Sequence, residues 1–102
     1  MVTDTVPAAT VSSAQGKDIS NFQGVEPASF WNGYHFGFAK ATEGTTFLAS
    51  TFPGNWANMK RAGIHRGAYH FFHPASDPIA QAKFFVSYVQ KQGLEAGDML
   101  VA

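Results

Sequence analysis

The chain has no cysteine, no excess of charge of either sign and no long apolar run. The absence of Cys from the 102 residues excludes disulfides, thiolate catalysis and cysteine-ligated metals, and it leaves the cellular compartment open. Seven basic and seven acidic side chains cancel, and no basic stripe is present to follow phosphates, so neither nucleic acid nor a membrane surface is an expected partner. No apolar run approaches the roughly 20 residues that a membrane-spanning helix needs.

Aromatic residues, in contrast, are plentiful. The hydrophobic fraction is 45% and ten residues are Phe, which indicates one folded domain with a substantial interior or binding groove. Residues 1–15 are rich in Thr, Val, Ala and Ser but lack the basic start and continuous apolar centre of a signal peptide. We predict that residues 1–15 form a flexible leader and that residues 16–102 form the folded part.

Strand-like and helix-like segments alternate along residues 16–102. Strands are predicted to start near residues 17, 36, 66 and 98. Helices are predicted over residues 25–34, over about ten residues around Trp56, and from Asp77 to Gly93. Asp77 is predicted to be the N-cap of this last helix, with Pro78 at its first position. This order predicts an α/β fold with about four parallel strands, whose polar ends should gather at the carboxyl edge of the sheet.

The helix signals also predict local details. Residues 45–52 are predicted to form a loop that Pro53 helps to end, and Gly63 is predicted to cap the middle helix in a left-handed conformation. In the last helix the spacing of apolar residues leaves Gln81 off the buried face. The predicted apolar stripe consists of Ala82, Phe85, Val86 and Val89.

Three of the predicted strands end in polar side chains. These are Asp18 with Ser20, Lys40 with Glu43, and Tyr69 with His70 and His73. A parallel sheet would bring the three groups together, but each also has a structural interpretation. Asp18 could cap a turn, and Lys40 with Glu43 could form a solvated surface ion pair. Tyr69 and His70 could be core residues with satisfied polar atoms. No metal is expected at His70 and His73, because a third ligand is lacking.

Carboxylates, a Lys and a Tyr among many aromatic rings favour sugar chemistry. Aromatic faces stack on the apolar faces of pyranose rings, and paired carboxylates serve as general acid and as anionic partner of an oxocarbenium-like transition state. The acid must then be kept protonated by apolar surroundings or by a neighbouring negative charge.

Three motifs make the sequence resemble the N-acetylmuramidases of glycoside hydrolase family 25. Residues 18–24 (DISNFQG) resemble the family's opening Asp-x-Ser-x-x-Gln-Gly, and residues 38–44 (FAKATEG) resemble its second-strand Lys-Ala-Thr-Glu-Gly. Residues 67–71 (GAYHF) resemble its third-strand Gly-Ala-Tyr-His-Phe. The motifs occur in the family's order and spacing, which makes the set far more specific than any one of them.

The resemblance implies a partial, TIM-like (β/α) barrel with a glycan groove at the carboxyl ends of the strands. It implies that Asp18 and Glu43 are acidic residues of the catalytic centre. It also implies that Lys40, Tyr69, His70 and Phe71 bind the substrate. The expected reaction is hydrolysis of the β-1,4 bond between N-acetylmuramic acid and N-acetylglucosamine in peptidoglycan, outside the cell and without metal or cofactor.

One family motif is missing. The family's fourth strand ends in Asp-x-Glu, which supplies the proton donor, whereas this chain ends at Ala102 and Asp98 lies at the start of the strand. We therefore expect the N-terminal half of a barrel, weakly active or inactive alone, whose unpaired strand edges would favour self-association. The alternatives are a non-catalytic module that binds peptidoglycan or chitooligosaccharides, and a product without function of its own.

Overall fold

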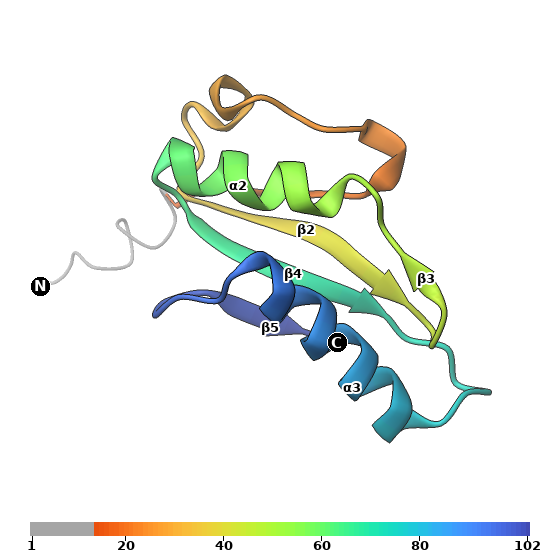
Figure 1. Cartoon of the computed structure of the whole chain (residues 1–102). Helices are drawn as coiled ribbons and strands as arrows, with labels where there is room; N and C mark the ends of the chain where they lie inside the picture. Colours follow the sequence, from red (N-terminus) through yellow and green to blue (C-terminus); the bar gives the residue numbers. More distant parts are fainter. Residues whose placement is uncertain (1–13) are drawn as a thin grey trace, which may run out of the picture.

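The structure is a computed structural model that describes residues 14–102, and it shows a twisted sheet with helices packed against it (Figure 1). The strands are β1 (Gly16–Ile19), β2 (Phe36–Glu43), β3 (Phe47–Leu48), β4 (His65–Phe71) and β5 (Met99–Val101). The α-helices are α2 (Phe52–Ala62) and α3 (Pro78–Gln92), and the 3-10 turns are η1 (Asn21–Gln23) and η2 (Ala28–Trp31).

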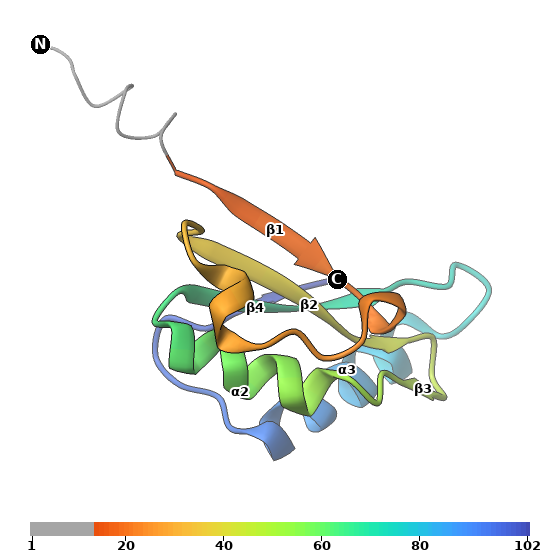
Figure 2. The same ribbon diagram turned by 90° about the horizontal axis from the view of Figure 1, so that it is seen from above.

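Four of the strands are parallel, in the order β1-β2-β4-β5. Strand β3 pairs antiparallel with the end of β2, on the edge that β1 leaves free. Figure 2 shows α2 and α3 on the same side of the sheet. The predicted α/β fold with four parallel strands is confirmed, and the arrangement is that of part of a (β/α) barrel.

The hydrophobic core lies between the sheet and these helices. Ile19, Ala39 and Ala68 are partners in register on β1, β2 and β4, and none is more than 1% exposed. The small Ala side chains on the two central strands allow the helices to approach the sheet closely. The larger residues of the core include Trp31, Phe52, Trp56, Met59, Phe85 and Val89.

The opposite face of the sheet carries the polar strand ends. Asp18 is in register with Phe38, and Lys40 is in register with Tyr69. Because side chains alternate along a strand, these four point away from the helices. Within residues 14–102 no helix covers this face (Figure 2). The Phe38 ring lies over Gly67, where an added Cβ would come within 2.4 Å of it.

The helix predicted over residues 25–34 is not present. Only the single 3-10 turn η2 forms, because Pro27 has extended backbone angles before it and Gly33 follows it at φ 88°. The aromatic spacing reflects packing around a turn instead. Trp31 is 1% exposed and its ring lies 6.1 Å from that of Tyr34.

The predicted loop of residues 45–52 ends near Pro53 as expected, but the helix begins one residue before Pro53. Helix α2 begins at Phe52, so Pro53 lies in its first turn, where a missing backbone N–H costs nothing. Strand β3 lies inside the segment predicted as a loop. Two predicted caps are confirmed: Gly63 is left-handed at φ 74°, and the Asp77 carboxylate accepts a hydrogen bond from the Ala80 N–H at 2.7 Å.

In α3 the buried face is shifted from the predicted stripe. Gln81 is 1% exposed, whereas Ala82 is exposed. The polar side chain of Gln81 was expected to face water, but its amide is fully hydrogen-bonded inside the protein, which makes burial of a polar residue possible. The predicted leader lies outside the described residues, apart from Ala14 and Gln15.

Candidate active site

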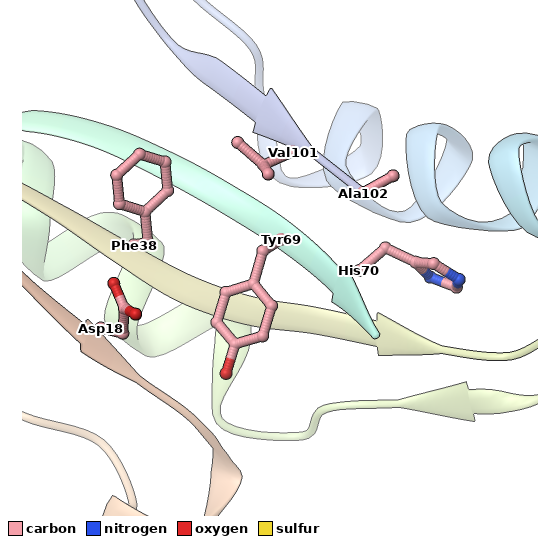
Figure 3. Close-up of a pocket in the computed structure, with 6 residues that line it drawn as sticks. All are labelled: Asp18, Phe38, Tyr69, His70, Val101 and Ala102. Atoms are coloured by element: carbon pink, nitrogen blue, oxygen red, sulfur yellow. The ribbon is translucent and has the colours of Figure 1, made fainter. Parts of the chain in front are cut away.

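A cavity of about 340 Å³ opens on the helix-free face, at the carboxyl ends of β1 and β4. Its lining residues are Asp18, Phe38, Tyr69, His70, Val101 and Ala102 (Figure 3). Asp18 comes from β1 and Tyr69 from β4, with β2 between them. Residues far apart in the sequence therefore form one hollow, as the parallel order predicts.

The Tyr69 hydroxyl is held in its protonated form. Partial burial raises the pKa of Tyr69, and the negative charge of Asp18 raises it further. A protonated phenol beside a carboxylate can donate one hydrogen bond and accept another. This pair therefore presents groups suited to a ligand with hydroxyl or amide groups.

A second polar group lies at the ends of β2 and β4. Lys40 and Glu43 are three residues apart, and strict alternation would place them on opposite faces of the sheet. The register between β2 and β4 shifts between Lys40 and Thr42, so the strand contains a bulge at Ala41. The bulge returns the Glu43 side chain to the face of Lys40, and the two form an ion pair.

Glu43 has a second partner, His73, which belongs to the third predicted group of polar strand ends. Nε2 of His73 lies 2.8 Å from Oε2 of Glu43, while Lys40 binds the other carboxylate oxygen. The hydrogen bond from Lys40, followed by that from His73, lowers the pKa of Glu43. Glu43 is therefore ionised at neutral pH, which suits hydrogen-bond acceptance and electrostatic stabilisation and does not suit proton donation.

Two exposed aromatic rings flank this ion pair. Nζ of Lys40 lies 5.1 Å from the centre of the Phe47 ring and 5.2 Å from that of Phe71. These are distances at which an ammonium is attracted to an aromatic face. Phe71 was predicted to bind substrate, and Phe47 on β3 was not.

His70 lines the edge of the cavity, but its ring does not face Asp18 or Tyr69 (Figure 3). Its Nδ1 lies 2.8 Å from the Thr42 hydroxyl and its Nε2 lies 2.8 Å from Oε1 of Gln81. The imidazole is 4% exposed, packs 5.6 Å from the Phe85 ring, and points away from Asp18 and Tyr69 (Figure 3). Both ring nitrogens are already bonded, so the side chain supports the strand ends from the helix side.

Phe47 and Gln81 make contacts that were not predicted from the sequence, whereas His73 is one of the predicted polar strand ends although not one of the predicted site residues. One local signal was available for Phe47: Gly44, with φ 59°, begins a three-residue connection that makes β2 and β3 a hairpin. In the described part of the chain, no cluster of three or more His, Asp or Glu residues could hold a metal ion. No helix among residues 14–102 has the length and apolar character needed to cross a membrane.

Comparison with known proteins identifies the relatives of this arrangement. The profile of the glycosyl hydrolases family 25 matches residues 11–102. The chain belongs to this family. Lysozyme M1 of Streptomyces globisporus is 43% identical over 89 residues, which cover 81% of this chain and 29% of that protein. The N,O-diacetylmuramidase of Arthroderma benhamiae is 40% identical over 87 residues, which cover 79% of this chain and 37% of that protein.

Among solved structures, a family 25 glycosyl hydrolase from Bacillus anthracis superposes with a TM-score of 0.75 at 29% identity. The match covers 86% of this chain and 41% of that one. The family assignment made from the three motifs is therefore confirmed. The chain spans about a third of the length of the curated family 25 relatives described above.

Proposed function

We propose that the chain is part of a peptidoglycan N-acetylmuramidase that hydrolyses the β-1,4 bond between N-acetylmuramic acid and N-acetylglucosamine. The observation that supports this proposal is the convergence of Asp18, Lys40, Glu43 and Tyr69 on the helix-free face of one parallel sheet. In the proposal, residues 16–102 contribute the first four parallel strands of the barrel and one side of its glycan groove.

The roles of the two acidic residues differ in the proposed reaction. The Asp18 carboxylate, beside the protonated Tyr69 hydroxyl, orients the substrate's acetamido group and stabilises positive charge that develops at the sugar ring. Glu43 remains ionised between Lys40 and His73 and accepts hydrogen bonds from sugar hydroxyls. Proton donation to the leaving oxygen is assigned to neither of them.

Peptidoglycan lies outside the cytoplasmic membrane, so we propose that the protein acts extracellularly. The balanced charges around Lys40 and Glu43 match an uncharged glycan backbone better than a polyanion. The proposed partner is therefore the glycan strand itself.

The test is incubation of the 102-residue chain with soluble peptidoglycan fragments, followed by calorimetry for binding and mass spectrometry for products. We expect binding, with new reducing ends at N-acetylmuramic acid formed slowly or not at all by this chain alone. Asp18→Asn should weaken binding several-fold. Asp77→Asn is the matched control, because Asn remains a good N-cap on α3.

A chimaeric protein, here called the graft, distinguishes a hydrolase from a binding module. Residues 16–102 would replace the aligned segment of the Streptomyces globisporus lysozyme M1. Lysis by the graft, lost on Asp18→Asn and retained on Asp77→Asn, would support the hydrolase. If the chain binds but a folded graft causes no lysis, the non-catalytic module is favoured. If the chain does not bind and the graft causes no lysis, the proposal is contradicted.

A further inference from the structure

We propose that Phe47 and Phe71, held on either side of the Lys40 ammonium, form a subsite that stacks against an uncharged N-acetylhexosamine unit. This pair of rings is here called the aromatic clamp. The proposal deepens the proposed function, on which it rests, by adding Phe47 and the β2–β3 hairpin to the groove.

Strand register places the clamp on the substrate side of the sheet. Glu43 is in register with Phe71 on β4 and with Phe47 on β3, so the three side chains form one row on one face. Their neighbours Leu48, Thr42 and His70 form the adjacent row on the opposite face. The hairpin therefore presents Phe47 beside the predicted site residues and Leu48 away from them.

The rings of the clamp are exposed, but the backbone that carries them is anchored on both sides. Phe47 is 39% exposed and Phe71 is 56% exposed, whereas Lys40 between them is 8% exposed. The N–H of Gly44 also donates to the Phe71 carbonyl at 3.2 Å, which ties the hairpin to β4. Exposed aromatic faces that are already ordered lose little entropy when a ligand stacks on them.

Charge restricts which ligand the clamp can take. The cation position between the rings is occupied by Lys40, so the clamp is closed to a quaternary ammonium or a basic side chain. Lys40 is in turn neutralised by Glu43, so the site offers no free positive charge to an anion. Ring faces beside a carboxylate that can accept hydrogen bonds suit an uncharged pyranose, which has an apolar face and a rim of hydroxyls.

His73 completes the site from the far side. Its Nε2 holds Glu43 at 2.8 Å, and its ring packs edge-on to Phe71 with centres 6.1 Å apart. His73 therefore acts as a positioning residue that fixes the carboxylate and one wall of the clamp together.

The test is titration of the full chain with chitotetraose, an uncharged N-acetylglucosamine oligomer, followed by amide shifts in heteronuclear NMR. We expect shifts of Gly44, Phe47 and Phe71 together with those of Asp18 and Tyr69. Phe47→Ala should weaken binding about tenfold, whereas Phe47→Tyr, which keeps the ring face, should bind within about twofold of the wild type. Leu48→Ala is the matched control, since it removes apolar surface from the same strand on the other face.

The spectra also report whether each variant is folded. If Phe47→Ala loses its dispersed spectrum, Phe47→Leu replaces it, because Leu keeps apolar bulk without a ring face and should also bind about tenfold more weakly. Binding that shifts Asp18 and Tyr69 but leaves the hairpin unshifted and is indifferent to Phe47→Leu would overturn the clamp and leave the proposed function standing. Absence of any binding by the wild-type chain would overturn both.

Discussion

Tyr69 and Asp18 are close enough for one to influence the titration of the other. Burial is the larger cause of the raised pKa of Tyr69, and the Asp18 charge adds to it. Asp18→Asn removes the charge and leaves the burial, so we expect the pKa of Tyr69 to fall while staying above the ordinary value near 10. The measurement is ultraviolet titration of the phenolate, with Tyr69→Phe identifying the contribution of Tyr69. An unchanged titration would show that the two groups do not face each other.

At the scale of single residues, the site residues were easier to predict from the sequence than the residues that hold them in place. Asp18, Lys40 and Tyr69 follow from alternation along parallel strands, because their side chains take the face that a regular strand gives them. Glu43 reaches that face only through the bulge at Ala41, which no local pattern indicates. The motif containing His70 was found, but the orientation of the His70 ring depends on Gln81, which lies on the following helix.

At the scale of elements, Gln81 fixes the β4–α3 connection. Its Oε1 accepts hydrogen bonds from His70 and from the His73 N–H, and its Nε2 donates to the His73 and Ser76 carbonyls. Gln81→Leu keeps most of the volume but leaves these groups without a partner. We expect it to lower the free energy of unfolding by about 2–3 kcal/mol and to broaden the NMR signals of residues 72–77.

The control for this change lies on the same helix. Gln90 is exposed, so Gln90→Leu should change the free energy of unfolding by less than about 0.5 kcal/mol. Urea unfolding followed by circular dichroism measures both variants. Equal stability of Gln81→Leu and the wild type would mean that the connection does not depend on this amide.

The elements themselves were predictable where capping residues mark them. Asp77 with Pro78 and Gly63 define helix ends through their own backbone and side-chain preferences, so these positions were predicted correctly. The aromatic spacing around Trp31 was misleading, since rings three residues apart also meet around a 3-10 turn. Strand β3 has two residues and forms because the end of β2 has a free edge. A short stretch of sequence does not show whether a neighbouring strand has such an edge.

At the scale of the whole molecule, the Arg66 guanidinium connects four elements. It donates two hydrogen bonds of 2.9 Å to Asp98 just before β5, and others to the Trp56 carbonyl on α2 and the Gly93 carbonyl after α3. It also stacks on Trp56, with Cζ 3.9 Å from the ring centre. Both charged side chains are less than 10% exposed, so removal of one leaves the other buried without a counter-charge.

This arrangement makes the stability of the fold depend on pH in a predictable direction. Burial by itself would raise the pKa of Asp98, but hydrogen bonds from Arg66 and the Glu95 N–H, together with the Arg66 charge, outweigh it and lower the pKa. A carboxyl whose pKa is lowered on folding stabilises the protein above its unfolded pKa near 3.9, and that contribution is lost as the pH falls through the folded value. Asp98→Asn should therefore lower the free energy of unfolding by about 3 kcal/mol at pH 7. The difference in the free energy of unfolding between Asp98→Asn and the wild type should narrow toward pH 2.

The control is Glu95→Gln, which removes the partner of Lys60 in an exposed ion pair. It should change the free energy of unfolding by less than about 1 kcal/mol at pH 7. A constant difference between Asp98→Asn and the wild type across urea titrations from pH 7 to pH 2 would mean that packing at this position, and not the charge pair, holds β5 against β4.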